Sequence, residues 1–283
     1  MTPVTTAITG ASGQLGRLAI AHLKTLIDPA DIVALARDPA KVADLGVAAR
    51  AFDYTQPGAM GAALAGVQTL VLISSSDFND RVGQHRNVIE AAKAAGVGRI
   101  VYTSILKADR SPMLIAADHR ETEAIIAGSG LPAAILRNGW YTENWTANLG
   151  GAIAAGALIG AAGTARFTPA ARRDYAEALA VVAADAGRVG VLELAGEEGF
   201  TLAELAAEVS RQTGKALPYN DLPAEVYQGL LEGFGLPAGF ARVLVDVDVR
   251  AHEGWLVDDS GTLTRLLGRP TVRLAEAVAT ALA

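Results

Sequence analysis

Residues 4–16 decide the fold: Val4-Thr5-Thr6-Ala7-Ile8-Thr9-Gly10-Ala11-Ser12-Gly13-Gln14-Leu15-Gly16. The first half of this stretch is apolar and rich in β-branched side chains, which is typical of a buried strand. The glycines then recur at every third position, and an amphipathic segment over residues 14–26 follows. Glycines in such a turn allow close approach of a ligand, and the helix behind it directs backbone N–H groups at a phosphate. The stretch therefore predicts an α/β protein that binds a dinucleotide.

The same alternation of strand and helix continues through the first half of the chain. Short apolar runs predict buried parallel strands over residues 4–9, 32–36, 48–52, 69–74, 100–104 and 133–137. Amphipathic segments such as 86–95 lie between them. This order predicts a Rossmann-like, doubly wound parallel sheet.

Beyond residue 138 the pattern changes to helices joined by short strands and proline-containing turns. Helical periodicity is found at residues 173–184, 201–213 and 224–232. We therefore expect a dinucleotide-binding domain over residues 1–137. A smaller, mainly helical substrate-binding region is expected over residues 138–283.

Composition limits the classes of function. The 283 residues are 51% hydrophobic and carry a net charge of −6, so a nucleic-acid partner is not expected. The absence of cysteine excludes disulfides and thiolate nucleophiles, and the four histidines lack metal-ligand spacing. Residues 147–165 are uncharged but rich in glycine and alanine, which insert poorly into membranes. No leader is visible, and we expect a cytoplasmic protein without a metal and without a membrane span.

Arg37, at the end of the second expected strand, bears on the choice of dinucleotide. A carboxylate at this place would bind a free ribose 2′-hydroxyl, whereas a guanidinium suits the 2′-phosphate of NADP. Asp38 could favour NAD instead, but it precedes Pro39, and Asp followed by Pro is the expected start of a helix. With Asp38 interpreted as a helix cap, Arg37 predicts NADP(H).

Polar and aromatic residues follow the later strands. Ser74, Ser75 and Ser76 end the fourth strand and Ser104 ends the fifth, at the edge where open parallel sheets bind ligands. The segment 137–144, Arg-Asn-Gly-Trp-Tyr-Thr-Glu-Asn, follows the sixth strand. Its aromatic side chains could pack beside a nicotinamide or a flat substrate, or they could form a core pair that anchors the second region.

Four segments together resemble the NmrA-like atypical short-chain dehydrogenases: residues 8–16, Ile73-Ser74-Ser75-Ser76, Gln84-His85-Arg86-Asn87-Val88-Ile89, and residues 137–144. The chain is similar in particular to the bacterial quinone-reducing members, and the resemblance extends to Asp258-Asp259-Ser260 and Leu267-Gly268-Arg269-Pro270. It implies NADPH as cofactor, quinone-like small molecules as substrates and a C-terminal substrate domain. The cofactor contacts that it implies are Gly10, Ala11, Ser12, Gly13, Gln14, Leu15, Arg37, Ser74, Ser75, Ser76, Asn138, Trp140, Tyr141, Glu143 and Asn144.

One departure from ordinary short-chain dehydrogenases concerns the proton donor. Their catalytic Tyr-x-x-x-Lys would fall on Ile115 and His119 in this sequence, so ketone reduction of the usual kind is not expected. Quinone reduction tolerates the loss, because water can protonate the aromatic phenolate that forms. By position, Ser104 or Tyr141 could stabilise the developing oxyanion and His119 could relay a proton. A non-catalytic NADP(H) sensor, or a reductase of dyes, imines or activated alkenes, remains the alternative, and the sequence leaves the oligomeric state open.

Overall fold

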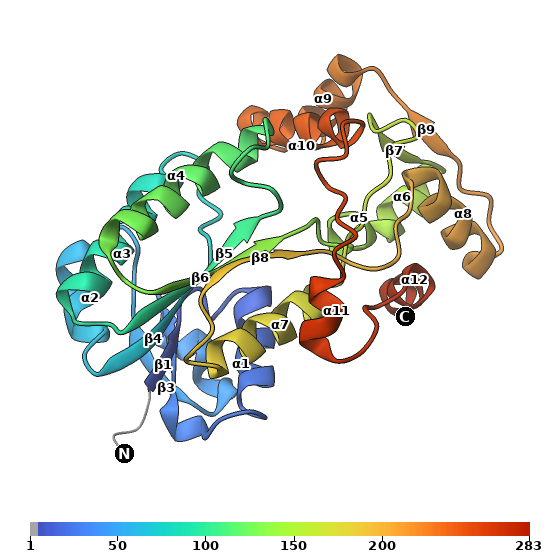
Figure 1. The fold of residues 1–283 in the computed structure, drawn as a ribbon. Coiled ribbons are helices and arrows are strands. Elements are labelled where there is room, and N and C mark those ends of the chain that lie inside the picture. Colours follow the sequence, from blue (N-terminus) through green and yellow to red (C-terminus); the bar gives the residue numbers. More distant parts are fainter. Residues whose placement is uncertain (1–4) are drawn as a thin grey trace. The chain divides into compact units, whose positions relative to one another are not determined.

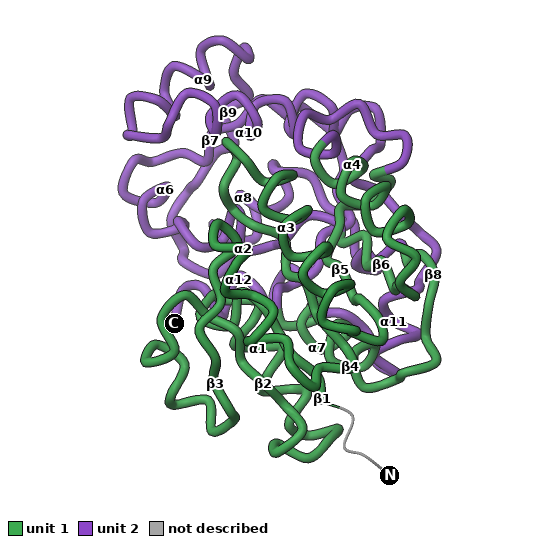
Figure 2. The backbone as a smooth tube through the Cα atoms, turned by 90° about the vertical axis from the view of Figure 1, so that its left-hand side faces the viewer, with its two compact units in different colours: residues 1–108, 118–138, 173–192 green, residues 109–117, 139–172, 193–283 purple. Residues whose placement is uncertain are grey.

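The computed structural model describes residues 5–283, and they form two compact units. Unit 1 comprises residues 5–108, 118–138 and 173–192, and unit 2 comprises residues 109–117, 139–172 and 193–283 (Figure 2). The chain thus contributes separate segments to each unit. Whether one unit holds a dinucleotide and the other a substrate stays a prediction.

A seven-stranded sheet has the order β3-β2-β1-β4-β5-β6-β8, and all of it except the last two residues of β8 belongs to unit 1 (Figure 1). The strands are β1 (Thr5–Ile8), β2 (Ile32–Ala36), β3 (Ala48–Ala51), β4 (Val67–Leu72), β5 (Arg99–Ile105), β6 (Ala133–Asn138) and β8 (Gly190–Leu194). The pairings between neighbours from β3 to β6 are parallel. The expected doubly wound sheet is therefore confirmed, with the expected start of the first strand, Val4, outside the described residues.

The direction of winding reverses beside β1, which creates the point where the ligand is expected. The chain passes from β1 outward to β2 and β3, and then returns to the other side of β1 as β4. Because the crossovers of parallel strands are right-handed, the reversal puts the connecting helices on opposite faces. The carboxyl ends of β1 and β4 consequently lie side by side, which is where open α/β sheets bind ligands.

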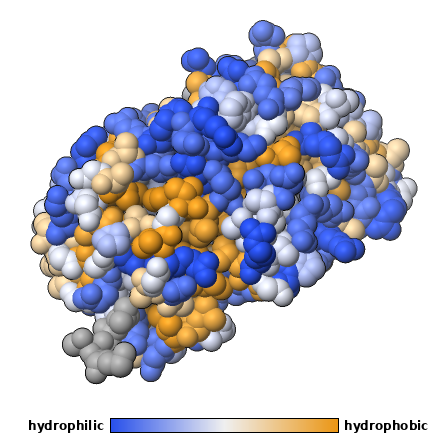
Figure 3. Space-filling view, viewed as in Figure 1, coloured by the Kyte–Doolittle hydropathy of each residue, from blue (hydrophilic) through white to orange (hydrophobic). Residues whose placement is uncertain are grey.

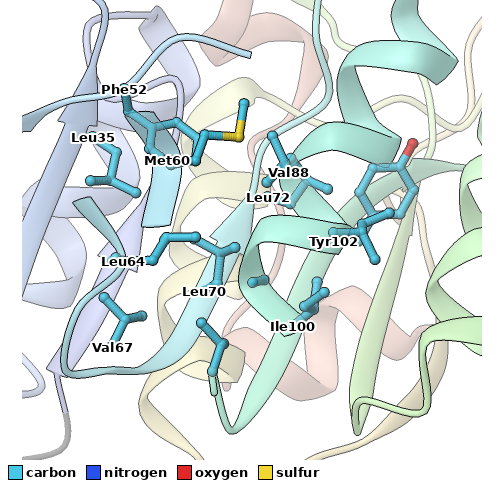
Figure 4. Packing of buried hydrophobic residues seen from close by; sticks show 14 of the residues in the cluster. Leu35, Phe52, Met60, Leu64, Val67, Leu70, Leu72, Val88, Ile100 and Tyr102 are labelled. Atoms are coloured by element: carbon cyan, nitrogen blue, oxygen red, sulfur yellow. The ribbon is translucent and has the colours of Figure 1, made fainter. Parts of the chain in front are cut away.

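Helices cover both faces of this sheet. Helices α2, α3 and α4 lie on one face, and α1 and α7 lie on the other (Figure 1). Their bounds are α1 (Gln14–Leu23), α2 (Pro57–Ala63), α3 (Arg81–Ala94), α4 (Leu114–Ser129) and α7 (Arg172–Ala184), with short 3-10 helices η1 (Pro29–Asp31) and η2 (Pro39–Leu45). Buried side chains of the sheet, including Leu70, Leu72 and Tyr102, pack against Met60 and Val88 from the helices (Figure 4).

Helix α7 is joined to the sheet of unit 1 by a buried arginine. The guanidinium of Arg99 on β5 donates to the carbonyl oxygens of Val182 and Ala183 near the end of α7, at 2.8 and 2.9 Å. It also donates to the carbonyl oxygen of Arg188 at 2.8 Å and to Thr69 Oγ1 at 3.1 Å. Carbonyl groups at a helix end, which otherwise lack partners, are thereby satisfied inside the protein.

Unit 2 is mainly helical, as the sequence predicts. Its elements are α5 (Glu143–Thr146), α6 (Leu149–Ala155), β7 (Leu158–Gly160), α8 (Leu202–Thr213), β9 (Tyr219–Asp221), α9 (Ala224–Gly233), α10 (Ala238–Ala251), α11 (Thr262–Leu267) and α12 (Leu274–Leu282). Strands β7 and β9 pair in parallel. Helix α8 begins with a reciprocal capping box between Thr201 and Glu204.

The uncharged stretch 147–165 contains only the short helix α6, followed by β7. Among the described residues, no helix combines the length and apolar character that a membrane crossing requires. On the face drawn in Figure 3, hydrophobic residues gather in several patches between hydrophilic ones.

Candidate functional site

The glycine turn between β1 and α1 has room for backbone alone. Gly10 has a φ of +61°, a conformation that favours glycine. A Cβ on Gly16 would lie 2.3 Å from the Gly10 carbonyl oxygen and 2.9 Å from Ala11 Cα. Gly10 is therefore required by the backbone conformation of the turn, and Gly16 by the close packing of the turn on its own helix.

This turn leaves the start of α1 open toward a ligand. Gly13 is the N-cap, and no side chain among the described residues caps the helix. The turn is closed by the Gly13 N–H, which donates to the Gly10 carbonyl oxygen at 2.9 Å. First-turn N–H groups have no partner within a helix, so together with the helix dipole they form a binding place for an anion. Ser12, Gly13 and Gln14 are exposed here.

At the end of β2, Asp38 and Arg37 have different surroundings. Asp38 is the N-cap of η2, its Oδ1 accepts from the Ala40 N–H at 3.0 Å, and Pro39 follows it. The interpretation of Asp38 as a helix cap is thus confirmed. Arg37 is exposed, and its positive charge interacts electrostatically with Asp53, which follows β3. A hydrogen bond from the Thr55 N–H is the main cause of the lowered pKa of Asp53, and Arg37 adds to it.

Tyr54 holds together two segments that carry expected ligand contacts. Its hydroxyl lies 2.5 Å from Thr9 Oγ1 and 2.8 Å from the Ile73 carbonyl oxygen. Thr9 Oγ1 also donates to the Val71 carbonyl oxygen and accepts from the Ile73 N–H. Burial raises the pKa of Tyr54, so the phenol stays protonated. The turn after β1 and the segment after β4 are held together through this side chain, which sequence reasoning missed.

Ser74 lies just after β4 and carries a buried hydroxyl. Its N–H donates to Thr103 Oγ1 at 2.9 Å. Its Oγ is buried and makes no hydrogen bond of ordinary geometry among the described residues, but it lies near the Tyr102 hydroxyl, whose pKa it lowers. Ser74 thus brings a buried hydroxyl, beside that of Tyr102, to the edge where open parallel sheets bind ligands.

Ser104, at the end of β5, is already engaged. Its Oγ donates to Glu123 Oε1 on α4 at 2.5 Å. Arg137 on β6 donates to the same carboxylate from Nε at 3.0 Å and from Nη2 at 2.6 Å. Because a hydroxyl has one hydrogen, Ser104 can donate to a substrate oxygen only if it leaves Glu123. The proposed oxyanion role of Ser104 therefore requires a rearrangement.

His119 on α4 is buried with Tyr102 of β5. The Tyr102 hydroxyl lies 2.8 Å from His119 Nδ1, and His119 is 6% exposed. Burial, with smaller contributions from the charges of Arg81 and His85, holds the pKa of His119 well below its usual value. The ring is consequently neutral at physiological pH, so any proton relay through it would pass along a neutral imidazole.

The segment after β6 divides between the units, because Asn138 belongs to unit 1 and residues 139–144 belong to unit 2. In unit 2, the Arg172 guanidinium lies 5.2 Å from the centroid of the Tyr141 ring. Both carboxylate oxygens of Glu143 accept from the Arg172 N–H at 2.9 Å. Trp140 is buried and Asn144 is exposed. These contacts agree with an anchoring role inside unit 2, and the cofactor role of this segment stays a prediction.

Comparison with known proteins shows the family to which the chain belongs. A family profile described as NAD(P)H-binding matches residues 10–186, which is more than half of the chain. The chain belongs to this NAD(P)H-binding family. Quinone oxidoreductase 2 of Escherichia coli is 49% identical over 276 residues, which cover 96% of each protein.

Solved structures of the same group have the same fold along the whole chain. The crystal structure of the NADPH-dependent quinone oxidoreductase QOR2 of Escherichia coli complexed with NADPH has a TM-score of 0.95 and 47% identity, and covers 99% of this chain and 100% of that one. Citrobacter sp. triphenylmethane reductase complexed with NADP(H) has a TM-score of 0.92 and 32% identity, and covers 98% of this chain and 100% of that one. The predicted resemblance to the bacterial quinone-reducing members of the family is confirmed.

The residues present fit the dinucleotide of the family. The open start of α1 suits a diphosphate, and Arg37 suits a further phosphate. The buried hydroxyl of Ser74 lies at the end of β4, next to the end of β1 in the sheet. These groups all lie in unit 1, at the carboxyl ends of β1, β2 and β4.

Proposed function

We propose that the chain is an NADPH-dependent reductase that transfers a hydride directly to a quinone or a similar conjugated electrophile. The observation that carries the cofactor choice lies directly after β2: Asp38 caps η2, whereas the neighbouring Arg37 is exposed and takes no part in the cap. The whole-chain similarity to E. coli quinone oxidoreductase 2 supports the substrate class.

In this proposal the residues of unit 1 bind and orient the cofactor. The backbone N–H groups at Gln14 and Leu15 hold the diphosphate, and Arg37 holds the 2′-phosphate. Ser74 and Ser76 adjoin the nicotinamide half. NADPH supplies the hydride, and the quinone becomes a hydroquinone anion that takes one proton from water. The protein has to orient the two rings and exclude competing reactions.

The cofactor choice is tested by Arg37→Ala. A charge-assisted contact to a phosphate contributes about 1.5–3 kcal/mol, so KM for NADPH should rise by about 10- to 100-fold. KM for NADH should change little, because NADH lacks the 2′-phosphate. Arg86→Gln, which removes an exposed arginine on α3, serves as the matched control. Equal effects of Arg37→Ala on both cofactors would refute the assignment of Arg37.

The substrate class is tested by NADPH oxidation with benzoquinones, triphenylmethane dyes, imines, enones and ketones. Turnover is expected with quinones and not with simple ketones, because the Tyr-x-x-x-Lys pair is replaced by Ile115 and His119. Cofactor binding without oxidation by any acceptor would instead identify a sensor.

The roles of Tyr141 and His119 are tested separately by Tyr141→Phe and His119→Gln. Each role is abandoned if its variant retains full quinone turnover. The pH dependence of kcat then distinguishes a lost proton relay from a lost packing contact.

A further inference from the structure

Ser75 is held by three side chains from the start of α3. Its N–H donates to His85 Nε2 at 2.9 Å, its hydroxyl donates to Gln84 Oε1 at 2.7 Å, and its carbonyl oxygen accepts from Arg81 Nε at 2.8 Å. The backbone N–H, the backbone carbonyl and the side chain of one residue are thus each bound by a different residue of a single helix.

The spacing of the three residues on α3 explains how all of their side chains contact Ser75. Positions 81, 84 and 85 are related by three and four residues, so their side chains lie on the same side of α3. All three are buried: Arg81 is 4% exposed, Gln84 is 6% exposed and His85 is fully buried. Burying three polar side chains is costly unless they are hydrogen-bonded. Their contacts with Ser75 supply part of these hydrogen bonds. In addition, Gln84 Nε2 donates to Asp77 Oδ2 at 2.6 Å, and Arg81 Nη1 lies 3.5 Å from Asp118 Oδ2.

The hydrogen bonds also define which ring nitrogen of His85 carries the proton. Because the Ser75 N–H donates to Nε2, this nitrogen carries no proton, and the ring proton is on Nδ1. Nδ1 lies 2.9 Å from Thr122 Oγ1, which in turn donates to the Asp118 carbonyl oxygen at 2.8 Å. A chain of oriented hydrogen bonds therefore runs from Ser75 through His85 to α4. Burial, with Arg81 close by, lowers the pKa of His85 to about 3, so the ring stays neutral.

Ser75 is flanked by the two serines that the hydrogen bonds leave available. Its own polar groups are occupied, and its Oγ additionally accepts from the Asp77 N–H at 3.1 Å. Ser74 has a buried hydroxyl without a partner of ordinary geometry among the described residues, and Ser76 is exposed. Fixing the middle residue fixes the direction of both neighbours.

We propose that Arg81, Gln84 and His85 are positioning residues that hold Ser75 and thereby set Ser74 and Ser76 against the nicotinamide half of NADPH. This inference rests on the proposed function. It gives Ser75 the role of an anchor instead of a direct cofactor contact. It also assigns a role to part of the Gln84-His85-Arg86-Asn87 segment.

The test uses isothermal titration calorimetry on the full chain. It compares the affinity for the whole cofactor with the affinity for its adenosine half. The probes are NADPH and adenosine 2′,5′-bisphosphate, which has the 2′-phosphate and the adenine but no nicotinamide. His85→Leu removes the acceptor of the Ser75 N–H, so affinity for NADPH should fall by about 5- to 30-fold. Affinity for adenosine 2′,5′-bisphosphate should stay within about twofold, because the glycine turn and Arg37 are untouched.

Matched variants separate positioning from loss of structure. His85→Gln places an amide oxygen near the former Nε2 and should restore most of the NADPH affinity, whereas Arg86→Gln should change neither affinity. If His85→Leu does not fold, the ratio of the two affinities is measured on Gln84→Met, which removes the acceptor of the Ser75 hydroxyl. Equal weakening of both probes, unchanged NADPH binding, or a failure of His85→Gln to restore it would each overturn the inference. If the unaltered chain binds neither probe, the proposed function itself has failed.

Discussion

Asp248 on α10 provides a prediction about the stability of unit 2. The carboxylate is buried, and its Oδ2 accepts from the Ala161 N–H at 2.9 Å. Burial raises the pKa of Asp248 to about 6, and the negative charge of Asp221 adds to the effect. Tyr219 and Tyr227 lie near enough for Asp248 to raise their pKa values as well. The unfolding free energy should therefore fall as the pH rises and Asp248 loses its proton. We expect Asp248→Asn to remove this fall.

The sign follows from the proton balance. The folded pKa of about 6 exceeds the unfolded value of 3.8. Between these two values the folded chain binds more protons, so its stability falls as the pH rises. The difference between the folded and unfolded pKa values changes the unfolding free energy by about 3 kcal/mol in total. About 1.5 kcal/mol of this change occurs between pH 5 and pH 8. Asn keeps an oxygen acceptor for the Ala161 N–H but does not titrate.

The measurement is urea unfolding followed by tryptophan fluorescence at several pH values. Trp140, Trp145 and Trp255 all lie in unit 2, so the signal reports on the unit that contains Asp248. The difference in unfolding free energy, variant minus unaltered chain, should rise by about 1.5 kcal/mol from pH 5 to pH 8. Asp259→Asn, at an exposed carboxylate, should give a flat difference. A flat difference for Asp248→Asn would refute the reasoning.

Three further substitutions test the cofactor turn and two buried arginines. Gly16→Ala puts a Cβ 2.3 Å from a carbonyl oxygen of the turn, so calorimetry should show NADPH affinity at least about tenfold lower. Gly58→Ala, where a Cβ meets nothing within 4 Å, should leave that affinity unchanged. Arg99→Met leaves three main-chain carbonyl groups without their donor and should lower the unfolding free energy in urea by about 3 kcal/mol. Glu123→Gln removes the anionic partner of the buried Arg137 and should cost about 3–5 kcal/mol; an unchanged melting temperature would contradict it.

Local patterns predicted much of unit 1. The apolar runs located β1 to β6 within a few residues, because strands buried on both faces are recognisable from composition alone. The exception is β3, which was expected to be buried but is mainly exposed. The Asp38-Pro39 pair located the start of η2, since capping depends on adjacent residues. Helix α3 begins at Arg81, five residues before the expected 86, because its first turns bury polar side chains that break the apolar periodicity.

Contacts between distant residues were not predictable in this way. Tyr54 reaches Thr9 across 45 positions, and Arg99 reaches Val182 across 83 positions. No local pattern indicates which buried tyrosine or arginine has such a partner. The hydrogen bond from Ser104 to Glu123 likewise changed the role that its position suggested.

The sequence by itself determined the class of this protein. The glycine spacing, the alternation of strands and helices, and Arg37 are local features, and their physical meaning depends on the backbone and the charge of neighbouring residues. Only the tertiary structure decided how the ligand edge is held. There, Ser75 is bound by Arg81, Gln84 and His85. Such hydrogen bonds require β4 and α3 to be packed together, because the donor and the acceptor belong to different elements of the fold.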